Sequence, residues 1–217
     1  MKFLYCFLIS TTLFAQDPWK NVYTQNAWQE RDSWQKPQEL LKQLNIRDGS
    51  TVADIGCHEG YMTMKLSKVV GAKGKVFAVD IEQSKLSKLK DHLSERKIVN
   101  VELVKGDEDN PKLSGHLLDA AIILDTYHEM DDHDSILQHV KVALKPGGRL
   151  VICEPIADER KSKSRSDQEA RHELSMNYVL DDLTKAGFQI IYKKETFVDR
   201  TKVKGDNMWI VVAQKPR

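Results

Sequence analysis

Cysteine is scarce in this sequence, and neither sign of charge is in excess. The 217 residues include three cysteines, and 33 lysines and arginines face 32 aspartates and glutamates, for a net charge of +1. Three cysteines cannot build a disulfide framework, so we expect Cys57 and Cys153 to be buried thiols. A nearly neutral chain carries no strong field for nucleic acid or a membrane surface, and neither is predicted as a partner.

Long apolar runs are also missing, with one short exception at the start of the chain. The run from Phe3 to Ala15 follows Lys2, is interrupted only by one serine and two threonines, and ends in a small residue. This pattern is typical of a secretory signal peptide and is too short to span a membrane comfortably. We therefore predict a signal peptide at residues 1–16, which would remove Cys6, and a secreted or periplasmic mature chain without membrane contact. An amphipathic start that stays on the chain is the alternative.

No internal repeat indicates a solenoid, and the length fits one domain with a real core. Hydrophobic residues make up 41% of the chain and charged residues 30%, as in a soluble globular protein. We predict a helical cap at residues 17–45, with a helix opening at Pro37, and a main domain at residues 46–217.

The main domain is organised around one stretch, TVADIGCHEG at residues 51–60. Its apolar run is short enough for a buried strand, and Gly56 and Gly60 follow that run. Residues 61–70 then repeat apolar side chains at helical spacing. Strand, glycine turn and helix are the start of a βαβ unit, in which the backbone of the turn can approach a ligand closely.

A second apolar run, KVFAVD at residues 75–80, ends in an acid. Asp80 lies 20 residues beyond Gly60, about the distance at which nucleotide-binding folds place a carboxylate against ribose hydroxyls. A buried strand that ends in a helix cap is the plainer alternative. The turn and the spaced acid together favour a nucleoside site.

These motifs resemble those of a known family, the class I S-adenosylmethionine-dependent methyltransferases. VADIGCHEGY is similar to the family's first motif, VFAVD to its second, and LKPGGRLVI to the turn before its fifth strand. The resemblance runs from about Trp34 to the C-terminus. It implies an α/β fold with a doubly wound, Rossmann-like, seven-stranded and mostly parallel sheet that ends in an antiparallel strand. It also implies S-adenosylmethionine as the cofactor. The chain departs from the family at His58, which replaces the middle glycine.

The resemblance also assigns candidate cofactor residues. Asp80 is expected to hold the ribose and Asp107 the adenine amino group, although a solvated turn is an equal alternative for Asp107. The residues expected to line the methionine end of the cofactor are Asp54, Gly56, His58 and Gly60. Asp125 ends the predicted fourth strand, 118–124, where ligands bind in open α/β sheets.

Four residues are candidates for chemistry near the transferred methyl group. His128 is the leading candidate for a base, because imidazole titrates near neutral pH. Glu129 can orient His128 or pair with its charge, Tyr127 can line the pocket or donate a hydrogen bond, and His172 can approach from the fifth strand. Each of them is, alternatively, a helix cap or a wall residue.

A metal site is the competing interpretation of the same region. The possible ligands are His128, Glu129, Asp131, Asp132, His133, Asp134 and His172. Five of them fall within consecutive turn and cap residues, where acids are ordinary. Their spacing matches no closed zinc pattern, so no metal is predicted.

The predicted function is methyl transfer to an O, N or C nucleophile on a small molecule, in an assembly whose oligomeric state the sequence does not set. A methyltransferase fold that binds ligands without catalysis is the alternative. A nicotinamide dehydrogenase fits less well, because Gly56 and Gly60 do not complete G-x-G-x-x-G. Residues 158–170 are predicted to form an exposed mobile loop, and Ser84 to cap a helix.

Overall fold

The computed structural model describes residues 25–113, 115 and 117–217. The predicted signal peptide at residues 1–16 and the first part of the predicted helical cap lie outside these residues. Among the described residues, no helix combines the length and the apolar character needed to cross a bilayer.

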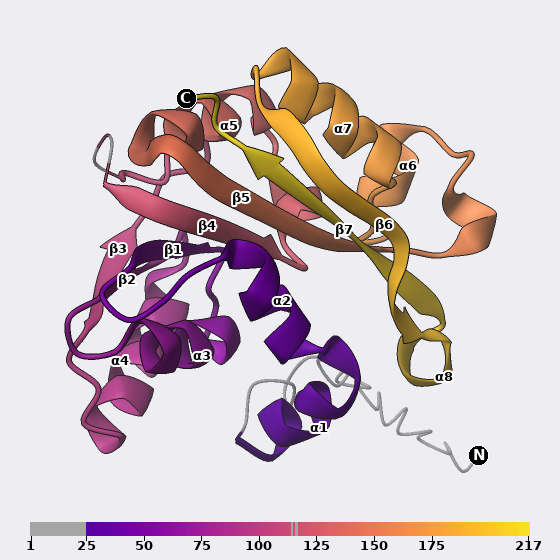
Figure 1. The fold of residues 1–217 in the computed structure, drawn as a ribbon. Coiled ribbons are helices and arrows are strands. Elements are labelled where there is room, and N and C mark those ends of the chain that lie inside the picture. The colour runs from indigo at the N-terminus through magenta and orange to yellow at the C-terminus, as the bar shows by residue number, and fades with distance from the viewer. Residues whose placement is uncertain (1–24, 114, 116) are drawn as a thin grey trace, which may run out of the picture.

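A seven-stranded sheet runs through the molecule (Figure 1). The strands are β1 (Thr51–Ile55), β2 (Lys75–Asp80), β3 (Val101–Lys105), β4 (Leu118–Leu124), β5 (Leu144–Ile156), β6 (Gln189–Arg200) and β7 (Asp206–Gln214). Their order is β3-β2-β1-β4-β5-β7-β6. Neighbouring strands are parallel except that β7 pairs antiparallel with both β5 and β6. The predicted doubly wound fold with an antiparallel C-terminal strand is confirmed.

Helices cover both faces of the sheet, with α5 and α7 on one face and α2, α3 and α4 on the other (Figure 1). The helices are α1 (Gln25–Gln35), α2 (Pro37–Leu44), α3 (Tyr61–Val70), α4 (Gln83–Glu95), α5 (His133–Ala143), α6 (Arg165–Glu169), α7 (Met176–Lys185) and α8 (Thr201–Lys204). Two short 3-10 helices are η1 (Tyr127–Glu129) and η2 (Asp158–Arg160). Helices α2, α3, α4, α5 and α7 each bury one apolar stripe, as their spacing predicts.

Strand register brings the glycine turn and the acidic strand ends to one edge. Ile55 pairs with Val79 of β2 and with Ile123 of β4, so the residues that follow these three strands emerge side by side. The strand order also reverses direction between β1 and β4. Ligands bind at such a switch point, outside the carboxyl ends of the strands.

Several local predictions need correction. The segment before Pro37 contains a helix of its own, α1, which the polar composition of its sequence did not indicate. Helix α4 begins before Ser84, with Glu82 at the capping position, so Ser84 is not the cap. Strand β5 extends three residues beyond Cys153 on the ligand-binding side. Cys57 and Cys153 are buried free thiols, as predicted.

The segment between β5 and α7 is folded rather than a free loop. It contains η2 and α6, and the side chain of Gln168 at its centre is fully buried. Gln168 Nε2 donates to the carbonyl oxygens of Arg160 and Lys163 at 3.0 Å each, and its Oε1 accepts from Ser175 N at 2.7 Å. The predicted exposure is confirmed for most of these residues, but the predicted free loop is wrong, because the buried amide of Gln168 supplies hydrogen bonds that fix the backbone.

Candidate functional site

A cavity of about 910 Å³ opens at the carboxyl ends of the central strands. Most of the predicted site residues line it, although they come from separate parts of the chain. The lining includes Asp54, Gly56, His58, Asp80, Asp107, Asp125, His128, Glu129 and His172. Gly60 and Tyr127 are not part of the lining.

The glycine turn after β1 is shaped by backbone that only a few residues tolerate. Gly56 has a φ of 73°, and a Cβ there would lie 2.2 Å from Thr126 Cγ2. Gly60 has a φ of 98°, and a Cβ would lie 2.3 Å from Leu89 Cδ1. Gly60 therefore serves helix packing at the start of α3 rather than the cavity wall.

His58 takes the conformation of the glycine that it replaces in the family motif. Its φ of 48° lies in the left-handed region, and its side chain lines the cavity. Burial and the nearby cations Lys85 and Lys88 lower the His58 pKa to about 3. The ring is therefore neutral at physiological pH and adds no positive charge against a sulfonium cofactor.

Two acids flank this turn. Asp80 Oδ2 accepts from His58 N at 2.8 Å, and its Oδ1 accepts from Glu82 N at 2.9 Å. The carboxylate of Asp80 is therefore held in place at the cavity wall, where it is available to bind ribose hydroxyls. Asp54 is buried, and Thr63 Oγ1 donates to its Oδ2 at 2.5 Å. Burial raises the pKa of Asp54 to about 6, against the hydrogen bond from Thr63 and the charge of Arg31.

The other two predicted cofactor acids differ in their surroundings. Asp107 is exposed and pairs with Lys112 Nζ at 2.8 Å, so it lines the cavity from a solvated turn. Asp125 has two guanidinium partners, Arg200 at 3.3 Å and Arg31 at 3.7 Å. Burial raises the pKa of Asp125, but these cations outweigh it and hold the pKa well below its usual range. Asp125 thus ties α1 and the end of β6 to the cavity.

His128 is fixed from behind by a carboxylate that the sequence analysis did not select. Its Nδ1 bonds Glu154 Oε2, and the side chain of Glu154 is fully buried. Glu154 Oε1 also accepts from Thr126 N at 2.7 Å and Tyr127 N at 2.9 Å. One carboxylate therefore shapes the whole turn after β4. The signal for it was an acid inside the apolar strand RLVICEPI, because a buried charge needs partners.

The protonation of His128 differs from the sequence-based expectation. Burial lowers its pKa, but the carboxylates of Glu154 and Glu129 outweigh burial and raise the pKa to about 10. With these partners the ring is an imidazolium at neutral pH, which donates hydrogen bonds and carries positive charge. This environment therefore does not favour the predicted role of His128 as a base with a pKa near 7.

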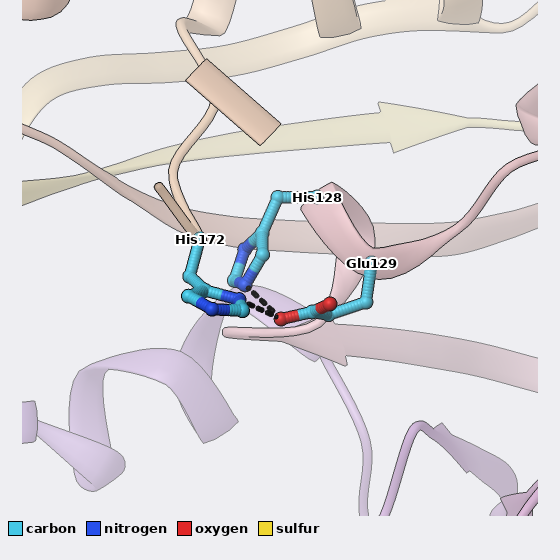
Figure 2. Close-up of side chains that lie close together, drawn as sticks. All are labelled: His128, Glu129 and His172. Atoms are coloured by element: carbon cyan, nitrogen blue, oxygen red, sulfur yellow. Dashed lines mark hydrogen bonds and ion pairs between the residues drawn. The ribbon is translucent and has the colours of Figure 1, made fainter. Parts of the chain in front are cut away.

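Glu129 lies between two imidazole rings (Figure 2). Its Oε1 is 3.1 Å from His128 Nε2 and 2.5 Å from His172 Nδ1. Hydrogen bonding to His128, together with His172, lowers the Glu129 pKa to about 2 against burial. His172 reaches this position from the segment before α7, as predicted for an approach from the fifth strand. These three residues also form a group whose possible metal-ligand atoms lie within 4.8 Å of one another.

Tyr127 lies on the other side of the turn. It is fully buried, and its hydroxyl donates to Asp182 Oδ2 of α7 at 2.9 Å. Burial and the Asp182 carboxylate raise the Tyr127 pKa above its ordinary value. Of the two roles predicted for Tyr127, hydrogen-bond donation is observed, but toward the core and not toward the cavity.

Residues 46–203 match the family model of a methyltransferase domain. A crystal structure of an S-adenosylmethionine-dependent methyltransferase from Aquifex aeolicus superposes with a TM-score of 0.73 at 25% identity, covering 86% of this chain and 93% of that one. The chain belongs to this family, the class I S-adenosylmethionine-dependent methyltransferases that its motifs resemble. The family places it apart from the nicotinamide dehydrogenases. The left-handed turn at Gly56, the anchored Asp80 and the neutral His58 fit the family's cofactor, S-adenosylmethionine.

Two curated relatives carry names for their substrates. A demethylmenaquinone methyltransferase of Oceanobacillus iheyensis is 28% identical over 128 residues, which is 59% of this chain and 53% of the relative. A ubiquinone/menaquinone biosynthesis C-methyltransferase of Marinomonas sp. is 32% identical over 115 residues, which is 52% of this chain and 46% of the relative. The chain thus spans about half the length of the curated relatives it matches.

Proposed function

We propose that this protein transfers the methyl group of S-adenosylmethionine to an O, N or C nucleophile on a small molecule. One observation carries the proposal. A single cavity holds the glycine turn and Asp80, which suit the cofactor, together with His128, Glu129 and His172, which suit a polar acceptor. The bound cofactor supplies an electrophilic methyl group on a sulfonium sulfur, and much of the rate of such a displacement comes from alignment.

The residues of this chain divide the remaining work. Asp80 and the turn orient the cofactor, and Asp54 places negative charge beside its cationic end. The cluster of His128, Glu129 and His172 directs hydrogen-bonding groups at the acceptor. A positive His128 donates a hydrogen bond to an acceptor oxygen and so favours the ionised acceptor, which is the better nucleophile; the acceptor's proton leaves to solvent.

Two features favour a ring that carries hydroxyl groups as the acceptor. The curated relatives are named for demethylmenaquinone and for C-methylation in quinone biosynthesis. The cavity combines the polar cluster with apolar wall residues, which include Leu124, Met130 and Ile136. A reduced short-chain demethylmenaquinone is therefore the first acceptor to test, with S-adenosylhomocysteine formation as the readout.

Replacement of His128 tests the site. We expect His128→Ala to reduce S-adenosylhomocysteine formation by about 100- to 1000-fold, the usual effect of losing one donor to a developing anion. Cofactor affinity, measured by calorimetry, should stay within a few-fold of the wild type. His139→Ala removes an exposed imidazole of α5 outside the cavity and serves as the control. Unchanged turnover in His128→Ala would reduce His128 to a wall residue.

A fold that binds ligands without catalysis is the second candidate, and the departure at His58 is the observation that favours it. Under that function the wild type would not bind S-adenosylmethionine in the micromolar range and would form no S-adenosylhomocysteine with any acceptor. Against this alternative, the left-handed backbone of His58 preserves the shape of the cofactor-binding turn.

A further inference from the structure

The cluster of His128, Glu129 and His172 is a set of metal ligands as well as a hydrogen-bonded network. Two imidazole nitrogens face one carboxylate oxygen, at 3.1 Å and 2.5 Å. Around a tetrahedral metal with bonds of about 2.0 to 2.2 Å, neighbouring ligand atoms lie about 3.3 Å apart. The ligand atoms here span at most 4.8 Å, so side-chain shifts of about 1 Å convert one arrangement into the other.

His128 is prepared for the role of a ligand by Glu154. The bond from Nδ1 to Glu154 Oε2 fixes the ring and directs Nε2 toward Glu129 and the cavity. Metal-binding histidines almost always donate their second ring N–H to a carboxylate, a backbone carbonyl or water, and this bond sets the tautomer and strengthens the ligand. Because Glu154 also bonds the backbone of Thr126 and Tyr127, this support is rigid.

Glu129 and His172 supply the adjustable part of the set. Their side chains are 51% and 62% exposed, against 4% for His128, so they can move outward to make room for an ion. His172 reaches the cluster with a φ of 58°, a conformation that a residue other than glycine rarely adopts. Such strain persists where a side chain must be held in place.

We propose that His128 Nε2, His172 Nδ1 and the Glu129 carboxylate bind one first-row divalent transition-metal ion, such as Zn²⁺. The two imidazoles favour such an ion over Mg²⁺ or Ca²⁺, which prefer all-oxygen sites. Metal binding displaces the proton from His128 Nε2, so the ion takes the place of the imidazolium charge, and Glu129 with the supporting Glu154 balances a charge of +2. Three protein ligands leave a coordination position on the cavity side, as in catalytic zinc sites.

This assignment replaces the sequence-based prediction of no metal. That prediction counted His128 and His172 among the possible ligands but rejected a metal on spacing, whereas the fold brings His172, 43 residues beyond Glu129, against the same carboxylate. The open position faces the space proposed for the acceptor, so the ion polarises an acceptor oxygen in the manner of a Lewis acid. This last role rests on the proposed function, but metal binding itself does not.

Metal binding is measured with the full chain, purified without a polyhistidine tag and stripped with a chelator. We titrate it by calorimetry with Zn²⁺ alone, in the absence of cofactor, and with Co²⁺, whose visible absorption reports nitrogen and oxygen ligation. We expect one ion per chain. His172→Ala and Glu129→Gln should each weaken Zn²⁺ affinity by about 100-fold. Glu154→Gln should weaken it by about 10- to 100-fold, because the carboxylate that orients His128 is lost. His139→Ala should leave the affinity unchanged, and circular dichroism verifies the fold of each variant.

Two results would overturn the metal site: no stoichiometric binding at about 0.1 mM Zn²⁺, or equal Zn²⁺ affinity in the wild type and His172→Ala. Glu129 would then be a hydrogen-bonded bridge between the two histidines. Titration with S-adenosylmethionine on the same preparation separates this failure from that of the proposed function. A chain that binds cofactor and no metal contradicts the metal site alone, and one that binds metal and no cofactor contradicts the methyltransferase proposal alone.

Discussion

Asp54 is a buried carboxyl group whose ionisation opposes folding. Its pKa is about 6 in the folded chain against an ordinary 3.8, because burial outweighs the hydrogen bond from Thr63 and the charge of Arg31. The shift corresponds to about 3 kcal/mol of unfolding free energy. A raised folded pKa means that this stability is present below pH 4 and is lost as the pH rises through 6.

Asp54→Asn should therefore stabilise the protein, increasingly so with pH. We expect the variant and the wild type to unfold at similar denaturant concentrations at pH 4. By pH 7.5 the variant should gain up to about 3 kcal/mol, since asparagine keeps an acceptor for Thr63 and carries no charge. Denaturant unfolding at the two pH values measures the effect. A difference that does not change with pH would refute the raised pKa, and unchanged cofactor affinity in the variant would remove Asp54 from the site.

Asp80 offers the sharpest test of the cofactor assignment. Its carboxylate lines the cavity and is anchored by backbone donors of His58 and Glu82. We expect Asp80→Ala to weaken S-adenosylmethionine binding by about 100-fold, because the two ribose hydroxyls would lose their hydrogen bonds to a charged acceptor. Asp109→Ala, at an exposed acid outside the cavity, is the matched control. Equal affinities in the two variants would eliminate the ribose role.

At the residue scale, motif spacing identified Asp80, His128, Glu129 and His172 as cavity residues, but not their partners. Glu154 and the arginines at positions 31 and 200 lie far from their partners in sequence, on β5, α1 and β6. Their pairing depends on strand register and helix placement, which spacing within a motif does not contain. The pKa of His128 depends on Glu154 in particular, so its protonation state could not be predicted from motif spacing.

At the scale of elements, the segment between β5 and α7 positions His172. Arg160 bonds Glu173 through two nitrogens, at 2.6 and 2.5 Å, and Arg165 bonds Asp182 of α7 at 2.7 and 3.0 Å. The Arg160–Glu173 pair and the buried amide of Gln168 join parts of the segment to one another, and the Arg165–Asp182 pair ties it to α7. Its charged residues are therefore partly used inside the molecule, which explains why composition alone predicted a free loop.

Replacement of Gln168 tests this role. Gln168→Ala removes the acceptor of Ser175 N and a donor to the carbonyl oxygens of Arg160 and Lys163, which keep bonds from Lys163 N and Tyr178 Oη. A buried group left unpaired costs about 1 to 3 kcal/mol. We expect faster amide exchange in residues 158–175, with the sheet strands unchanged. Gln138→Ala, on the exposed side of α5, is the control. Normal exchange in the Gln168 variant would show that the ion pairs alone hold the segment.

The long elements were predictable because their patterns are strong. Residues 61–70 and 75–80 form α3 and β2 with the predicted bounds, and 118–124 forms β4. Helix α1 was missed because its sequence is polar: the residues that it buries at helical spacing include the polar Arg31 and Gln35 beside Trp28. Tertiary burial outweighs weak local preference in such a helix.

At the scale of the whole molecule, the sheet places its switch point under a single large cavity, and the family relation assigns that cavity a cofactor. The predicted signal peptide at residues 1–16 stays a prediction, and with it the secreted or periplasmic location. We propose that an exported chain would depend on cofactor supplied from outside its own compartment. Detection of the intact N-terminus on protein recovered from cells would contradict the cleavage.

Calorimetric titration of the purified protein measures directly whether this cavity binds S-adenosylmethionine. The protein is titrated with S-adenosylmethionine and, separately, with S-adenosylhomocysteine. We predict one site with micromolar affinity for each, and a melting temperature that rises with the concentration of either ligand. Absence of heat and of any thermal shift at millimolar ligand would contradict the account and favour a methyltransferase fold that has lost its cofactor.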